Sequence, residues 1–235
     1  MTHSTKLAVI FTPTQHEFSA CQKRLEQVHL DGWTTRCIKT GPGKANAAFH
    51  TASLKGMGLE PHVLIGAGTS GALQHGLRQG EIIASAHATV ADWKMIHDDG
   101  ESYANYGELN YAHDMLERHA DLHIACDDPK VTSLLAKLHT NGFRQGAMLT
   151  SDMFIAGERH KLDYGKRFGC LACDMESGVF GYLANRYLAC PWLNIRVVAD
   201  TIGESFEDYA AIEPQMTKIL AEHLEEVMRQ IAESW

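Results

Sequence analysis

Short apolar runs alternate with segments of helical periodicity along most of the chain. Runs of about four to eight apolar residues predict buried strands, and apolar residues that recur every three or four positions predict helices covering a sheet. The expected strands are 7–11, 33–41, 62–68, 80–92, 147–151, 171–175 and 193–200. One expected helix carries Phe18, Cys21, Leu25 and Val28 on one face, and the others occupy 43–57, 131–138, 179–187 and 216–231, the last with Pro214 in its first turn.

The alternation of strands and helices is typical of an α/β protein with a mostly parallel sheet. No linker or change in composition divides the chain, so we expect a single domain over residues 1–235. Open α/β sheets bind ligands at the carboxyl ends of their strands. The segments that end expected strands with polar or small residues are 12–17, 66–71, 150–155 and 174–176, together with Asp200. A functional site is expected where these segments meet.

The charge of the chain disfavours one large class of partners. There are 21 Lys and Arg against 29 Asp and Glu, a formal net charge of −8, whereas nucleic-acid binding needs a basic surface that displaces counterions. No segment approaches the run of about 20 apolar residues that spans a bilayer. The first residues lead into a strand rather than a signal-peptide core. We therefore expect a cytoplasmic protein that binds neither nucleic acid nor membrane.

Cysteine and histidine form no pattern that predicts a disulfide scaffold or a metal site. Of the six cysteines, only Cys170 and Cys173 have a suggestive spacing. In a strand they would lie about 10 Å apart, beyond disulfide reach, so we interpret them as core residues. The fourteen histidines include no HExxH motif, and His113, His119 and His123 have no companion Cys or Glu at ligand spacing. We expect no metal.

Residues 66–71 spell GxGxxG directly after an expected strand, which matches the dinucleotide-binding fingerprint. The fingerprint requires a helix next, but the following segment has two glycines and no apolar stripe, and only Asp92 lies where the ribose-binding acid belongs. The dinucleotide interpretation is therefore disfavoured. Two interpretations of the segment remain. It is either a loop whose N–H groups, with the Thr69 and Ser70 hydroxyls, bind an anion or a polarised oxygen, or a tight turn that needs glycine.

Five segments, in order, resemble the nucleoside phosphorylases and nucleosidases. They are KTGPGKANAA, GAGTSGALQHGLRQGEIIAS, LTSDMFIAG, CDMESGVFGYLANR and NIRVVADTIGE, of which MES and RVVAD are the most specific parts. Within that family, the chain looks most like the methylthioadenosine/S-adenosylhomocysteine nucleosidases. The resemblance implies a three-layer α/β/α sandwich around a mixed, mostly parallel sheet. It also implies hydrolysis of a purine N-glycosidic bond, no metal or organic cofactor, and a homodimer.

The resemblance also assigns the catalytic roles. It places Asp200 as the general acid toward the purine N7 and Glu176 on the ribose hydroxyls. Arg196 would help Glu176 hold the attacking water. Glu17 would activate that water, although PTQHEF matches the family only after a one-residue slip, which keeps His16 as an alternative base.

The same resemblance implies a set of substrate-binding residues. Phe154 would stack on the purine, the backbone of Ile155 would bond the base edge, and Met175 would pack against the ribose. The expected site is completed by the end of the glycine-rich segment, with Thr69, Ser70 and Gly71.

Three carboxyl groups at three strand ends suit the cleavage of a ribosyl–purine bond. An acid beside the base avoids an anionic leaving group, a carboxylate beside the sugar stabilises developing positive charge, and another can deprotonate water. Each group also has a structural alternative. Glu17, Glu176 and Asp200 could be carboxylates at helix N-termini or in loops, and Phe154 could be a core residue.

Hydrolysis and phosphorolysis differ in the need to hold a phosphate dianion, for which family phosphorylases use arginines. One precedes the hydroxyl of the glycine-rich segment by three residues, where this chain has Gly66. The other usually follows the first strand, where this chain has Pro13, Thr14 and Gln15. Water is therefore the favoured nucleophile. The alternatives are a purine nucleoside phosphorylase and a non-catalytic nucleoside-binding relative, which the retained carboxyl groups disfavour.

Two departures from the family pattern affect the site. Asp174 stands where a glutamate is usual, and Ala199 replaces a serine whose hydroxyl could hold the general acid. The segment 92–112, expected to be a loop, lies where the family shapes the 5′ pocket, so methylthioadenosine, S-adenosylhomocysteine, 5′-deoxyadenosine and futalosine-type nucleosides all stay open. Its aromatic residues, Trp93, Tyr103 and Tyr106, predict a contact with a partner subunit.

Overall fold

The computed structural model describes residues 5–92, 94–98, 100–103 and 123–235. In this part of the chain the central sheet has ten strands, in which β8, β5, β10, β11, β3, β12, β4 and β9 follow one another, and β1 joins β2 to β3. They are β1 (Lys6–Thr12), β2 (Trp33–Lys39), β3 (Val63–Ala72), β4 (Ile82–Ser85), β5 (His87–Val90), β8 (His123–Ala125), β9 (Arg144–Gln145), β10 (Ala147–Thr150), β11 (Cys170–Asp174) and β12 (Trp192–Asp200). Parallel pairs predominate, while β11 with β3, β12 with β4, and β5 with β8 are antiparallel. The predicted mixed, mostly parallel sheet is confirmed.

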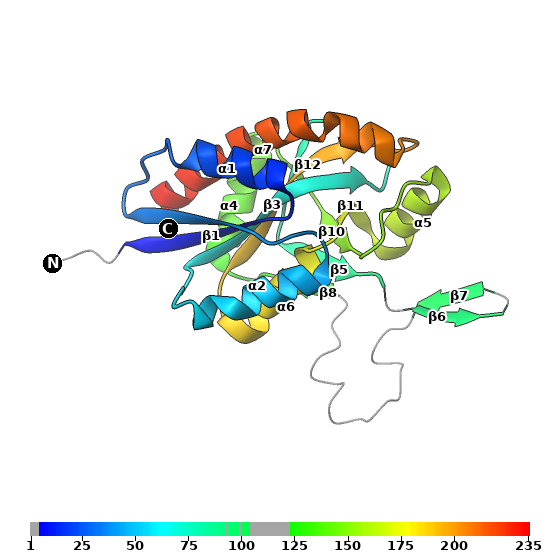
Figure 1. The fold of residues 1–235 in the computed structure, drawn as a ribbon, viewed down its shortest axis with the longest axis horizontal. Coiled ribbons are helices and arrows are strands. Elements are labelled where there is room, and N and C mark those ends of the chain that lie inside the picture. Colours follow the sequence, from blue (N-terminus) through cyan, green and yellow to red (C-terminus); the bar gives the residue numbers. More distant parts are fainter. Residues whose placement is uncertain (1–4, 93, 99, 104–122) are drawn as a thin grey trace, which may run out of the picture.

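Helices cover both faces of the sheet, which gives the expected three layers. They are α1 (Gln15–Leu25), α2 (Lys44–Gly56), α4 (Pro129–Thr140), α5 (Glu158–Phe168), α6 (Ser177–Leu183), the π-helix η2 (Ala184–Leu188) and α7 (Phe206–Ser234). Figure 1 shows α1 and α7 packed together on one face, and α2 with α6 on the other. None of the described helices is long and apolar enough to cross a membrane.

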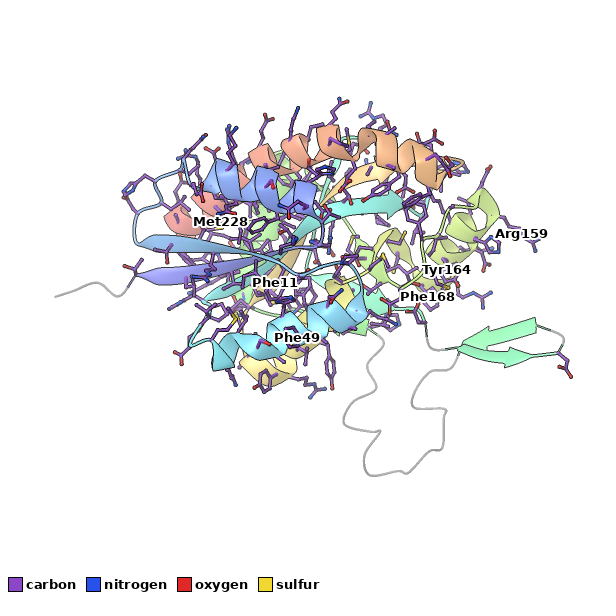
Figure 2. The ribbon with its side chains drawn as sticks, viewed as in Figure 1. Phe11, Phe49, Arg159, Tyr164, Phe168 and Met228 are labelled. Carbon is purple, nitrogen blue, oxygen red and sulfur yellow. The ribbon has the colours of Figure 1, made fainter. Side chains whose placement is uncertain are left out.

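The core lies between these layers. Every residue of β12 is buried, as expected for a central strand covered on both faces. Phe180 of α6 packs edge-on against Trp192 of β12 with ring centroids 5.6 Å apart. Phe11 of β1 and Met228 of α7 are also buried, whereas Phe49 of α2 lies on the outer surface (Figure 2).

The glycine-rich segment is neither a loop nor a tight turn, because β3 continues through it to Ala72. Its glycines are required by side chains that lie against the strand. A Cβ on Gly66 would come within 2.3 Å of the Phe180 ring, and one on Gly71 within 2.8 Å of the Asp200 carboxyl group. Periodicity alone does not reveal such close approaches.

The expected strand at 80–92 is two strands, β4 and β5, which meet at the buried Ala86. The Ser85 hydroxyl donates to the His87 carbonyl at 2.8 Å and accepts from its N–H at 3.1 Å, which fixes a bend. The bend is needed because β4 pairs with β12 and β5 with β10. The apolar run at 80–92 therefore gives no sign that its two halves pair with different strands.

Helix α1 ends at Leu25, so Val28, which was expected on its face, lies outside it. Two other helices also differ from expectation. Helix α7 begins after Ser205, which forms a capping box with Asp208, so Pro214 lies inside the helix and not in its first turn. Helix α5 was not expected at all. Its buried face is formed by Lys161, Tyr164 and Gly165, and a charged residue and a glycine on that face interrupt the apolar pattern.

Part of the segment expected to be a loop at 92–112 forms an antiparallel hairpin of β6 (Lys94–His97) and β7 (Gly100–Tyr103). Trp93 and Tyr106 lie outside the described residues, so the expected partner contact there stays a prediction. All six cysteines are free thiols, as expected for Cys170 and Cys173.

Candidate active site

A cavity of about 650 Å³ opens beside the ends of β1, β3, β10, β11 and β12, under the N-terminal part of α7. Every site residue predicted from the sequence lines it. These are Glu17, Thr69, Ser70, Gly71, Phe154, Ile155, Met175, Glu176, Arg196 and Asp200. The alternative base, His16, also lies on its wall.

Glu17 is held rigidly at one side of the cavity. It is the third residue of α1, where its Oε2 accepts the Thr14 N–H at 2.8 Å in a capping box. Its Oε1 accepts the N–H and hydroxyl of Thr69 at 2.8 and 3.0 Å, which ties α1 to β3. The residue is 1 % exposed, and burial raises the pKa of its carboxyl group although these hydrogen bonds and Arg196 oppose the rise. A fixed carboxylate with a raised pKa suits a base that takes a proton from water.

His16 points to the rim instead. Its side chain is 59 % exposed, and its Nδ1 lies 3.0 Å from Glu213 of α7. Glu213 also accepts the Thr14 hydroxyl at 2.8 Å. One position along a helix turns a side chain by about 100°, which accounts for the different surroundings of His16 and Glu17.

Glu176, Asp174 and Arg196 form a buried cluster at the floor. Arg196 Nη2 lies 2.8 Å from Asp174 Oδ2 and 3.5 Å from Glu176 Oε2. The Gly43 N–H donates to Glu176 Oε1 at 2.9 Å, which brings the KTGPGK segment to the site. Burial raises the pKa of Glu176 to about 8, against the lowering effect of Arg196. Arg196 is thus aimed by Asp174 and contacts Glu176 more loosely.

Asp200 ends β12 and pairs with a residue that the sequence did not indicate. Lys161 of α5, which is closed to solvent, donates from Nζ to Asp200 Oδ2 and, at 2.7 Å, to the Thr201 carbonyl. Burial raises the pKa of Asp200, and Lys161 opposes this rise. The only available signal was a lysine three residues before Tyr164 on the buried side of an amphipathic segment.

An aromatic wall closes the cavity on the side of α7. The Phe154 ring lies 5.0 Å from Phe206 and 5.6 Å from Tyr209, measured between centroids. Phe154 is 40 % exposed, so it is not a core residue and its ring is available to a planar ligand. The Tyr209 hydroxyl lies 3.2 Å from that of Thr69. Phe206 and Tyr209 were not among the predicted residues. Their closeness in the sequence to Asp200 was the one signal that could have placed them in the site.

The chain is similar to known proteins in sequence and in fold. Over 196 residues, 78 % of this chain and 76 % of the relative, the chain is 26 % identical to the 5′-methylthioadenosine/S-adenosylhomocysteine nucleosidase of Actinobacillus succinogenes. Its fold matches the nucleosidase of that name from Neisseria meningitidis, solved with methylthio-immucillin-A, with a TM-score of 0.75, 18 % identity and coverage of 95 % and 99 % of the two chains. It also matches a futalosine hydrolase mutant of Helicobacter pylori with a TM-score of 0.75, 13 % identity and coverage of 95 % and 98 %.

The family expected from the sequence is confirmed by a model that spans nearly the whole chain. The model is described as the phosphorylase superfamily, and residues 7–231 match it. The chain therefore belongs to the phosphorylase superfamily.

Proposed function

We propose that this protein is a purine nucleosidase that hydrolyses the N-glycosidic bond of a 5′-modified purine nucleoside. The observation that carries the proposal is the meeting of Glu17, Glu176 and Asp200 with the exposed ring of Phe154 in one cavity. A cavity of about 650 Å³ suits a small molecule. The sequence relatives carry the name of such a hydrolase.

The purine lies against Phe154, with its edge toward the Ile155 backbone and its N7 toward Asp200. As the C1′–N9 bond breaks, its electron pair enters the purine ring, and a proton from Asp200 goes to N7. The leaving base is then neutral, which lowers the barrier to its departure. The raised pKa of the buried Asp200 supports this role, because a carboxyl group with a raised pKa keeps its proton up to a higher pH.

The sugar lies between Met175 and Glu176, whose carboxyl group binds the ribose hydroxyls. Positive charge that develops on the sugar favours the ionised form of Glu176. Water attacks C1′ and gives a proton to Glu17, while Arg196 restrains the water and Glu176. Thr69, whose N–H and hydroxyl bind the Glu17 carboxylate, keeps that base in one orientation.

The charges around the cavity favour water over phosphate as nucleophile. Among the described residues that line it, Arg196 is the only lysine or arginine. Its Nη2 pairs with Asp174 at 2.8 Å, and Glu17 and Glu176 stand beside it. A phosphate dianion placed there would meet two carboxyl groups and no unpaired guanidinium, which is unfavourable.

Methylthioadenosine and S-adenosylhomocysteine are the first substrate candidates, and a role in methionine salvage follows from them. A futalosine-type nucleoside is the second, because the fold also matches a futalosine hydrolase. The enzyme acts in the cytoplasm without a metal or organic cofactor.

It works as a homodimer. Three apolar side chains offer surface for a partner, since Phe49, Met57 and Tyr187 are 67 %, 51 % and 45 % exposed. A monomeric mass by light scattering, with full activity, would contradict the dimer.

The test of the function is a panel of purine nucleosides incubated with the purified protein, with and without inorganic phosphate. Released base and sugar are identified by mass spectrometry. We expect free base and free sugar at a rate independent of phosphate. A sugar 1-phosphate as main product would establish a phosphorylase, and tight binding without any release of base would establish a non-catalytic binding protein.

A further inference from the structure

Lys161 has a placement that the general acid–base scheme leaves unexplained. It lies on α5, is 0 % exposed, and does not line the cavity. Its Nζ contacts the carboxyl group of Asp200 and the carbonyl of Thr201. A fully buried lysine is rare without a partner, because burying its charge is costly. Asp200 supplies that partner, so Lys161 reaches the reacting atoms only through Asp200.

The carboxyl group of Asp200 has few other supports. Ala199, the preceding residue, has no hydroxyl or other side-chain donor. On its other side a Cβ at Gly71 would lie 2.8 Å from Oδ2, so β3 presents only backbone there. Lys161, bonded at the same time to the Thr201 carbonyl, fixes the distance between α5 and the end of β12. Its ammonium group thus defines where the carboxyl group stands.

Titratable groups face Asp200 from several of the elements packed around it. Lys161 approaches from α5 and Glu204 from the turn after β12, with opposite effects on the Asp200 carboxylate. Cys173 of β11 has its pKa raised to about 12 by burial, and burial raises the pKa of the Tyr209 hydroxyl on α7 as well. Both therefore stay neutral near pH 7. Lys161 is the one cation in this group.

We propose that Lys161 is a positioning residue for the general acid, which orients the Asp200 carboxyl group and sets the pH above which that group loses its proton. The proposal rests on the nucleosidase function proposed above. The ammonium stabilises the carboxylate form of Asp200, so the acid loses its proton at a lower pH than burial alone would allow. Activity should therefore fall on the alkaline side earlier than it would without Lys161.

Two substitutions separate the charge from the orientation. Lys161→Gln keeps an N–H donor without the charge, and Lys161→Met keeps neither. Both should fold, because Asp200 can take up a proton and leave no buried charge unpaired. We expect the alkaline limb of kcat/KM to move up by about one pH unit or more in both variants. On the plateau, kcat should fall about tenfold in Lys161→Met and less in Lys161→Gln, with KM within about threefold of the wild type.

The controls identify the route of the effect. Lys166→Met, on the exposed side of the same helix, should leave the pH profile unchanged. In an Asp200→Asn background, Lys161→Met should cause no further loss of rate, because its effect passes through Asp200. An unchanged alkaline limb in both Lys161 variants, or a further large loss in the double variant, would overturn the proposal.

A measurement without turnover keeps this inference separate from the proposed function. Carbon-13 NMR of protein labelled at aspartate, with the signal assigned by Asp200→Asn, follows the protonation of Asp200 directly. We expect its titration midpoint to rise in Lys161→Met and Lys161→Gln. An unmoved midpoint refutes the role of Lys161. Absence of base release by the wild-type protein refutes the nucleosidase instead.

Discussion

The carboxylate of Asp174 lies 2.8 Å from the guanidinium of Arg196, and both side chains are 1 % exposed. Asp174 also accepts the Thr150 hydroxyl at 2.9 Å and the N–H groups of Glu176 and Ser177 at 3.3 and 3.2 Å. One carboxylate therefore caps the start of α6 and aims the arginine at the floor of the cavity. Asp174, which stands where the resemblance leads us to expect a glutamate, thus forms a buried ion pair with Arg196.

Asp174→Asn should destabilise the protein by about 3 kcal/mol, because an amide leaves the buried charge of Arg196 without its closest partner. Unfolding in urea at pH 7 measures the loss. Asp163→Asn is the matched control, since Asp163 pairs with Arg167 at 3.3 Å on the surface and is 54 % exposed. Its cost should stay below about 1 kcal/mol. Equal costs for the two variants would mean that burial adds nothing to the Asp174 pair.

Glu17→Gln should abolish hydrolysis, with a loss on the order of 10² or more, because an amide cannot take a proton from water. His16→Gln, one position earlier and facing the rim, should retain most of the activity. Steady-state rates of base release compare the two. Glu17→Gln should still bind the free purine, which calorimetry can measure. If His16→Gln is the inactive variant and Glu17→Gln the active one, the histidine is the base.

Gly68→Ala should reduce kcat at least about tenfold, because the added methyl group displaces both Arg196 and Glu17 from their positions in the site. A Cβ on Gly68 would come within 2.3 Å of Arg196 Nη1 and 3.0 Å of Glu17 Oε1, and Arg196 cannot yield freely because it is buried and paired. Gly56→Ala is the control, since nothing lies within 4 Å of a Cβ there. It should keep full activity and gain up to about 1 kcal/mol in stability. Full activity in Gly68→Ala would show that the backbone of β3 does not constrain the site.

The sequence predicted most of the strands and helices, among them β3, β12 and α7, because a buried strand and an amphipathic helix leave distinct periodic signals. It also placed Glu17, Glu176, Arg196 and Asp200 in one site, because their segments resemble those of the family. Glu17, Glu176 and Asp200 follow or end strands, whereas Arg196 lies within β12. It missed Lys161 because a buried lysine looks like a surface residue until its partner is known. Pairing between α5 and β12 is a tertiary contact that no local pattern encodes.

The same limit applies to the glycine-rich segment. Loops and strands can both contain clustered glycines, and the reason for them in β3 lies in side chains from α6 and β12. The break between β4 and β5 likewise depends on which strands pair with each half. Local propensity cannot decide either feature, because both follow from packing between distant parts of the chain.

Glu176 should make the stability of the folded protein fall as the pH rises. Its pKa is about 8 in the folded protein, raised from 4.5 chiefly by burial. Between these values the folded state holds a proton that the unfolded state has lost, so rising pH favours unfolding by up to about 1.4 kcal/mol per pH unit. The stabilisation is complete below pH 4.5 and is lost as the pH passes through 8.

Glu176→Gln removes this titration, so its free energy of unfolding should fall less steeply with pH than that of the wild type. Urea unfolding at pH 5, 6, 7 and 8 measures both slopes, and Glu222→Gln on the exposed side of α7 is the control that should keep the wild-type slope. The free energy of unfolding of the variant should rise relative to that of the wild type with each step toward pH 8. Its base release should be strongly reduced, because the carboxylate that binds the ribose is gone. Parallel stability curves for Glu176→Gln and the wild type would show that Glu176 is already ionised in the free protein at pH 5, and that Arg196 outweighs burial at the floor of the cavity.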